Sequence, residues 1–92
     1  MDSKPILFRP GTVCATPAVL ENVSQQKLIH LVMRHICGDW GDTRMADQKA
    51  NKLAIHNGSR ILSWYQISGN LRVLIITEAD RSATTIMLDN EY

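Results

Sequence analysis

The chain has 92 residues, 45% of them hydrophobic, and a formal net charge of +1 at pH 7. So short a chain can close one hydrophobic core but leaves too few residues for a second, which predicts a single domain. The near-zero charge argues against a general electrostatic attraction to nucleic acid or to an anionic membrane, and no apolar run approaches the roughly 20 residues of a membrane-spanning helix.

Residues 1–10 mix basic side chains, two prolines and a short apolar run, which predicts either a flexible N-terminal segment or a weakly held edge segment ahead of a domain over residues 11–92. Residues 11–15 are small or β-branched and indicate a short strand. Thr16 then suits the N-cap of a short helix, and Pro17 suits its first position, where the missing N–H is no loss.

The main core helix is predicted over residues 25–37, with Ser24 as its N-cap and Gly38 as its C-terminal stop. Its apolar side chains recur at helical spacing and form a wide stripe, which suits a helix lying on a sheet. The stripe comprises Leu28, Ile29, Leu31, Val32, Met33, His35 and Ile36. The shorter helix over residues 17–22 is expected to turn Leu20 to the same core, with Val19 as a second candidate.

A third helix is predicted over residues 44–57. Its apolar stripe is narrow and suits close packing rather than bulk burial. The stripe consists of Ala46, Ala50, Leu53 and Ala54. The outer face is basic through Arg44, Lys49 and Lys52, and it is interpreted either as a solvated helix surface or as a modest surface for an anion or a partner.

Three strands end the chain. Residues 59–67 and residues 71–77 flank a Ser-Gly-Asn turn, and this pattern is typical of an antiparallel hairpin. After a charged break at residues 78–82, residues 83–88 return as a third strand. The sequence thus predicts a small α+β domain of order β-α-α-α-β-β-β, in which an antiparallel sheet of three to four strands packs on helices.

Polar side chains gather at two corners of the predicted fold, a first corner over residues 38–42 and a second corner over residues 78–82. A histidine near several carboxylates can bind a divalent metal or move protons, and an exposed tryptophan often anchors a protein partner. The candidate binding residues at or beside the two corners are His35, Asp39, Trp40, Asp42, Glu78, Asp80 and Arg81.

A structural interpretation competes with each of these candidates. Carboxylates in tight turns mostly cap helices or close the turn, Trp40 serves as a lid over the core helix, and Arg81 pairs with a nearby carboxylate. No H-x-x-x-H, H-E-x-x-H or C-x-x-C spacing occurs, so we predict no metal ligand, no catalytic residue and no cofactor. Cys14 and Cys37 are expected to be buried and reduced, as in a cytoplasmic protein.

Residues 34–41 read R-H-I-C-G-D-W-G, and residues 76–85 read I-T-E-A-D-R-S-A-T-T. In these two stretches the chain resembles a family of small bacterial proteins found on plasmids, prophages and other mobile elements. The resemblance covers residues 11–92 and departs at Leu74 and Asp89, where members often have tryptophan and proline. It implies no biochemical activity.

Three hypotheses of function follow. The first is a non-enzymatic interaction or regulatory protein of a mobile element, with counter-defence as one version, which binds a host or plasmid-encoded protein through the two corners. The second is a small metal-dependent hydrolase or nuclease-like enzyme that uses His35 and the carboxylates. The third is a nucleic-acid-binding regulator acting through the basic face of the third helix. A homodimer through the partly apolar strand at residues 60–67 is a further prediction, and no membrane partner is expected.

Overall fold

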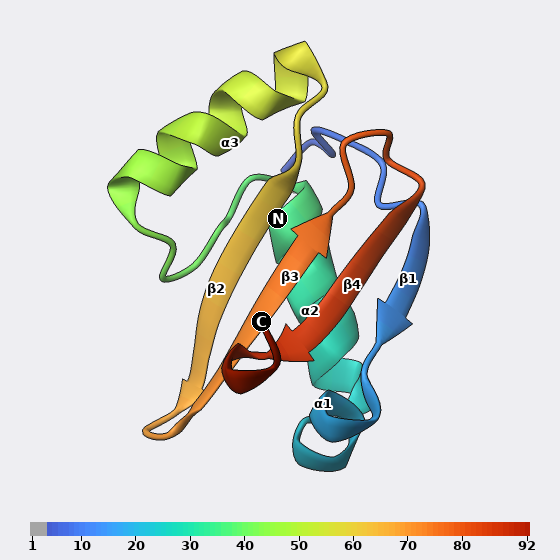
Figure 1. Ribbon diagram of the computed structural model, residues 1–92, viewed down its shortest axis with the longest axis vertical. Helices are drawn as coiled ribbons and strands as arrows, with labels where there is room; N and C mark the ends of the chain where they lie inside the picture. The colour runs from blue at the N-terminus through green and yellow to red at the C-terminus, as the bar shows by residue number, and fades with distance from the viewer. Residues whose placement is uncertain (1–3) are drawn as a thin grey trace.

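The computed structural model describes residues 4–92. Three strands form the antiparallel part of its sheet, as the sequence predicted: β2 (Ile61–Ser68), β3 (Leu71–Thr77) and β4 (Ala83–Leu88) (Figure 1). β3 lies between the other two. Its apolar run fits this place, because Val73 and Leu74, which point to opposite faces, are both fully buried.

A fourth strand makes the sheet mixed, so the prediction of a purely antiparallel sheet is wrong. β1 (Thr12–Ala15) pairs parallel with β4, and the strand order is β1-β4-β3-β2. The chain passes through three helices between β1 and β2, and a connection of this length lets a strand join the far edge of the sheet in the parallel sense. The predicted element order β-α-α-α-β-β-β is confirmed.

The three helices occupy separate places around the sheet (Figure 1). α2 (Gln25–Ile36) crosses one face of the sheet, α1 (Pro17–Asn22) lies at the lower end of α2, and α3 (Met45–Asn57) lies beside β2. Thr16 and Ser24 cap α1 and α2 as predicted, because each side-chain oxygen accepts a hydrogen bond from a backbone N–H three residues on. No helix within residues 4–92 is long and apolar enough to cross a membrane.

The hydrophobic core lies between α2 and the sheet. Leu28, Leu31 and Ile36 of α2 are buried in one cluster with Ile75 and Ile86 of the facing strands. The α2 residues recur at the spacing that places side chains on one face of a helix. Ile75 and Ile86 are a cross-strand pair that faces inward, so the helix pattern and the strand pattern bury their apolar side chains in the same core.

Two predictions about the core are wrong. In α1 the buried residue is Val19, whereas Leu20 is 53% exposed, because the cap at Thr16 fixes the helix so that its third residue faces the sheet. In α2 the buried stripe is narrower than predicted, and Ile29 and Met33 stay exposed at its margin. The sheet edge beside that margin is the four-residue β1, which is too short to cover them.

The side of α3 that faces the sheet also differs from the prediction. Ala54 is buried as expected, but its buried companion is Asn51, and Leu53 is 65% exposed. Ala46 and Ala50 are exposed as well. A polar contact from Asn51 to β2, described below, decides which side of this helix faces the sheet.

The N-terminal segment is attached to the domain over its described part. Leu7 N donates a hydrogen bond to Ile36 O at 2.8 Å, and the Phe8 side chain is buried in the core cluster. The predicted flexible segment, residues 1–10, falls in part on residues 1–3, which lie outside the described residues.

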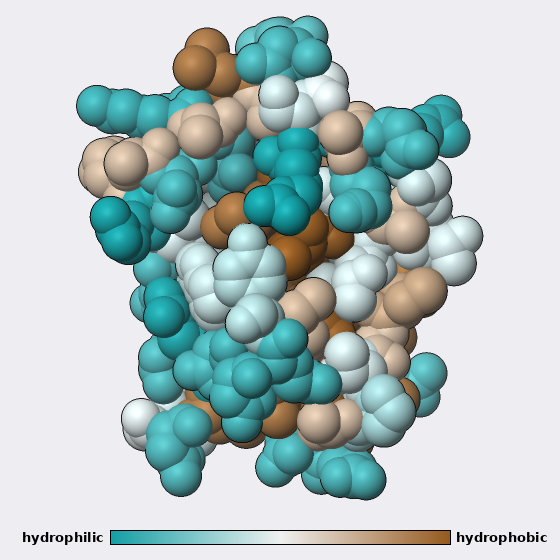
Figure 2. Space-filling model, in the orientation of Figure 1, coloured by the Kyte–Doolittle hydropathy of each residue, from teal (hydrophilic) through white to brown (hydrophobic). Residues whose placement is uncertain are grey.

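The sheet face opposite α2 is covered at one end by the C-terminal tail, which includes the short 3-10 helix η1 (Asp89–Glu91) (Figure 1). The Tyr92 ring meets the Trp64 ring edge-on at 6.1 Å, and the Arg72 guanidinium lies 4.3 Å from the centroid of the same Trp64 ring. Figure 2 shows this face, where hydrophobic atoms gather in a central hollow among hydrophilic side chains.

The two cysteines are free, but the prediction that both are buried is wrong. Cys14 is exposed and Cys37 is partly exposed. Cys14 lies on the edge strand β1, where its side chain alternates to the face away from α2.

Candidate functional site

His35, the candidate acid, base or metal ligand, is fully buried between α2 and the sheet. Its Nδ1 lies 2.5 Å from Ser63 Oγ and its Nε2 lies 2.9 Å from Thr77 Oγ1. Burial disfavours the imidazolium and lowers the pKa of His35 to about 3, so the ring is neutral at pH 7. Neither ring nitrogen is accessible to a metal ion or a substrate in this conformation.

The hydroxyl groups around His35 determine which ring nitrogen carries the hydrogen. Thr84 Oγ1 donates to Pro10 O at 2.7 Å, which uses its one hydrogen. Thr84 Oγ1 also lies 2.7 Å from Thr77 Oγ1, and in this contact Thr84 must accept the hydrogen bond that Thr77 donates. Thr77 has then used its own hydrogen and accepts from His35 Nε2, which leaves Nδ1 to accept from Ser63. The buried chain runs in one direction, from Ser63 to Pro10.

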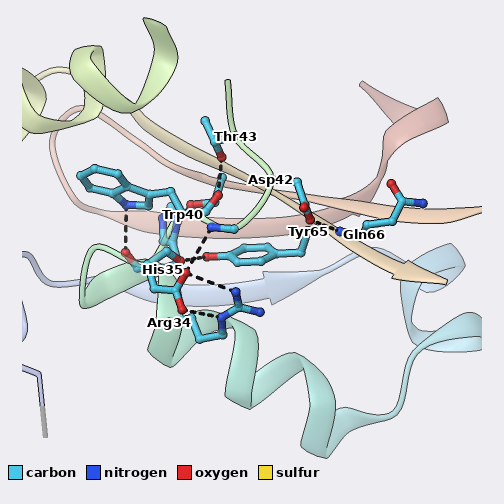
Figure 3. Close-up of polar contacts among 10 residues, drawn as sticks. Arg34, His35, Trp40, Asp42, Thr43, Tyr65 and Gln66 are labelled. Carbon is cyan, nitrogen blue, oxygen red and sulfur yellow. Dashed lines mark hydrogen bonds and ion pairs between the residues drawn. The ribbon is translucent and has the colours of Figure 1, made fainter. Parts of the chain in front are cut away.

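Asp39 and Arg34 form an ion pair at the first corner (Figure 3). Arg34 Nε donates to Asp39 Oδ2 at 2.8 Å, and Arg34 Nη2 donates to Asp39 Oδ1 at 3.2 Å. These hydrogen bonds raise the pKa of Arg34 and lower that of Asp39. The buried Tyr65 hydroxyl donates to Asp39 O at 2.7 Å, and its ring lies under the Arg34 guanidinium at 4.8 Å.

Trp40 is buried, with 4% of its surface exposed, and its indole Nε1 donates to His35 O at 3.2 Å (Figure 3). It covers the C-terminal end of α2, where backbone carbonyls lack helical partners. In this position Trp40 acts as a lid over the core, in agreement with the structural interpretation.

Asp42 and its neighbour Thr43 bond to the outer edge of β2 (Figure 3). Asp42 N donates to Trp64 O at 2.8 Å, and Asp42 Oδ2 accepts from Gln66 N at 2.7 Å. Thr43 Oγ1 accepts from Trp64 N at 2.9 Å. The first corner thus acts in place of a neighbouring strand along this part of β2.

Asn51 of α3 continues the same cover along β2. Its Nδ2 donates to Leu62 O at 2.7 Å, and its Oδ1 accepts from Leu62 N at 3.2 Å. One side-chain amide therefore satisfies both outward-facing backbone groups of Leu62. Together with Asp42 and Thr43, it occupies the outward backbone groups of β2 from Leu62 to the Gln66 N–H.

The second corner is held by Arg81, and the prediction that this residue pairs with a carboxylate is wrong. Its Nη1 donates to Ser59 O at 2.6 Å and to Glu78 O at 3.1 Å, and its Nη2 donates to Ala54 O at 2.8 Å. Ala54 O lies in the last turn of α3 and also accepts the capping hydrogen bond from Gly58 N at 3.0 Å. Arg81 therefore joins the β3–β4 connection to the end of α3.

Asp80 closes the turn next to Arg81. Its Oδ1 accepts from Ser82 N at 2.9 Å, and hydrogen bonding from Ser82 lowers the pKa of Asp80. Glu78, the remaining candidate, is partly exposed at the end of β3. The side chain of Asp80 thus makes the turn contact that the structural interpretation gave to carboxylates in tight turns.

The two corners do not form one polar cluster. Within residues 4–92 no hydrogen bond or ion pair joins them, and no group of three His, Cys, Asp or Glu side chains is placed to hold a metal ion. Phe8 lies between the corners, with the Arg81 guanidinium 5.6 Å from its ring and the His35 ring edge-on at 5.2 Å.

An apolar groove between β1, α1 and α2 was missed by the sequence analysis. It has a volume of about 300 Å³, and apolar side chains supply nearly all of its lining. Its exposed walls are Val13, Leu20, Ile29 and Met33. Val32 and Ile86 form part of its floor. The signal in the sequence was the pair Ile29 and Met33, four residues apart at the margin of the α2 stripe, which was interpreted as part of the core.

The basic residues Arg44, Lys49 and Lys52 are exposed at and along α3.

Comparison of the chain with protein-family models, with curated proteins and with solved structures found no match.

Proposed function

We propose that this protein works by binding another protein, without catalysing a reaction, and that the apolar groove is its contact surface. The observation that carries this proposal is the grouping of Val13, Leu20, Ile29 and Met33 around one groove, each about half exposed. Apolar patches of this kind on a small domain commonly mark a site of protein interaction. By contrast, most polar side chains of the two corners form hydrogen bonds within the protein.

The identity of the partner is proposed from the resemblance alone. Residues 34–41 and 76–85 resemble proteins of mobile elements, which supports a host or plasmid-encoded partner in the bacterial cytoplasm and a counter-defence role for the binding. The free thiols of Cys14 and Cys37 are in line with a reducing compartment.

The other two hypotheses gain no comparable support. An enzyme that uses His35 needs that side chain open to a substrate, and here it is fully buried. A nucleic-acid regulator needs a clustered basic surface, and Lys49 and Lys52 share the exposed side of α3 with Leu53 and Met45.

The proposal predicts which substitutions abolish binding. Affinity capture from the host bacterium should use the wild type, an Ile29→Gln, Met33→Gln variant and a matched Met45→Gln, Leu53→Gln control. The control removes equally exposed apolar side chains from α3, away from the groove. We expect the wild type and the control to retain the same host protein and the groove variant to lose it.

All three proteins must first give the same circular dichroism spectrum, so that a loss of binding is not a loss of fold. Capture of the same proteins by all three would contradict the assignment of the groove. If the wild type retains no protein above the background of bare resin, the proposal of a protein-binding function fails.

A further inference from the structure

The two edges of the sheet differ in their hydrogen bonding. On β2 the outward N–H and C=O groups of Leu62 and Trp64 and the N–H of Gln66 are bonded by Asp42, Thr43 and Asn51. At the opposite edge, β1 is the outermost strand of the described chain. Natural proteins generally protect strand edges, so an edge left open beside an apolar groove calls for a partner.

The register of β1 shows which backbone groups are open. Thr12 N donates to Ser82 O and Thr16 N donates to Ile86 O, so the even-numbered residues face β4. The N–H and C=O groups of Val13 and Ala15 therefore point away from the sheet. Groups in this arrangement are complementary to one extended backbone.

The groove lies where the side chains of such an added strand would fall. Val13 and Ala15 turn their side chains to the α2 side of the sheet, where both line the groove. A strand beside β1 lies about 4.8 Å further out, and every second side chain on it points to the same side. Those side chains would meet Ile29 and Met33, whose exposed fractions are 60% and 49%.

The shape of the site favours a single segment over a second folded copy. The open backbone groups lie on a strand of only four residues, beside a groove of about 300 Å³, which fits one narrow chain. A strand that adds to an edge binds with less area, because main-chain hydrogen bonds supply affinity and a pocket for alternate side chains supplies specificity.

We infer that β1 is the docking edge for an extended segment of the partner protein, which adds to the sheet as a fifth strand and inserts aliphatic side chains, two residues apart, into the groove. This inference rests on the proposed function and names how the same site recognises its partner.

The test uses a phage-displayed library of random twelve-residue peptides, selected on the full chain, with the enriched sequences then made as capped synthetic peptides. Binding is measured on the wild type, on Ala15→Pro, which lacks the outward N–H, and on Ala15→Ser, which keeps it. We expect peptides with alternating aliphatic residues whose affinity falls about tenfold or more on Ala15→Pro and less than twofold on Ala15→Ser.

A readout on the wild type keeps the test valid if Ala15→Pro does not fold. Amide hydrogen exchange at Val13 and Ala15 should slow when the peptide binds, while exchange at Leu62 on the closed edge should not change. Absence of enriched peptides, or unchanged exchange at both residues, would overturn the inference. A wild-type chain that is dimeric by size exclusion and already protects Val13 and Ala15 without peptide would overturn it as well.

The two proposals fail in different ways. A host protein that the Ile29→Gln, Met33→Gln variant loses but a folded Ala15→Pro variant retains would leave the groove as the binding site and remove the added strand. A wild type that captures no protein removes the proposed function itself.

Discussion

Each hydroxyl group in the buried chain of hydrogen bonds from Ser63 to Pro10 has one acceptor for its hydrogen. The carbonyl at the end of the chain can only accept, and this fixes the direction of every hydrogen bond before it and the tautomer of His35. A protonated ring would carry a second N–H on Nδ1, and Ser63, which donates to Nδ1 in the neutral state, would have to turn its own hydrogen away to accept it. The arrangement therefore holds a neutral histidine, in accord with its lowered pKa.

The burial of His35 makes the stability of the protein depend on pH. His35 takes up a proton near pH 6.5 when the protein is unfolded but only at about pH 3 when it is folded. The unfolded state thus binds more protons between these values, and the free energy of unfolding falls as the pH falls from 6.5, by up to about 1.4 kcal/mol per pH unit. Urea unfolding at pH steps from 7.5 to 4.5 measures the slope.

The control for this measurement is His30→Gln, because His30 is an exposed residue of the same helix. That variant should show the same slope as the wild type. A free energy of unfolding that stays constant between pH 6.5 and pH 4.5 would contradict a buried, neutral His35. Asp39, whose pKa is lowered mainly by the hydrogen bond from Arg34, adds a loss of the same sign only below about pH 4.

The role of His35 could not be predicted from the sequence. The residue fits the buried stripe of α2 and also fits a site rich in carboxylates. Ser63 and Thr77, which decide between these interpretations, lie 28 and 42 residues further along the chain. Local spacing carries no information about such partners.

At the scale of helices and strands, the sequence correctly predicted those features that depend on contacts between residues close together along the chain. The caps at Thr16 and Ser24 were predicted correctly, since each bond spans three residues. The β2–β3 hairpin was predicted as well, because alternation and a short turn specify it. The parallel pairing of β1 was missed, since its partner β4 lies some seventy positions further along the chain.

The phase of α3 is a case in which a polar contact overrides apolar patterning. We predict that Asn51→Leu, similar in volume, destabilises the fold by about 2 kcal/mol, because Leu62 is left with an unpaired N–H and C=O. Chemical unfolding measures the loss, and amide exchange at Leu62 should quicken. The exposed neighbour Lys52→Gln is the control, and an equal effect from both would exclude the edge contact as the cause.

For the molecule as a whole, the described part of the N-terminal segment, residues 4–10, contributes Phe8 to the core. Phe8 is 8% exposed and contacts His35 and Arg81, so it joins the end of α2 to the second corner. From the sequence alone Phe8 was expected in a flexible or weakly held segment, because the charged and proline residues around it dominate the local composition.

We therefore predict that Phe8→Ala lowers the free energy of unfolding by about 3 kcal/mol or more, as for other buried aromatic residues. Ile6→Ala removes a side chain from the same segment that is 60% exposed, and it should change stability by less than about 0.5 kcal/mol. Thermal or chemical unfolding compares the two, and similar values for both would show that the segment does not contribute to the core.

The closed β2 edge also sets a limit on assembly. A sheet that is open at both edges can take up copies without end and grow into a fibril. Here the outward groups of β2 from Leu62 to the Gln66 N–H are already bonded by Asp42, Thr43 and Asn51. Two copies that joined through β1 would therefore each turn this occupied edge outward, where a third copy finds few free groups to pair with.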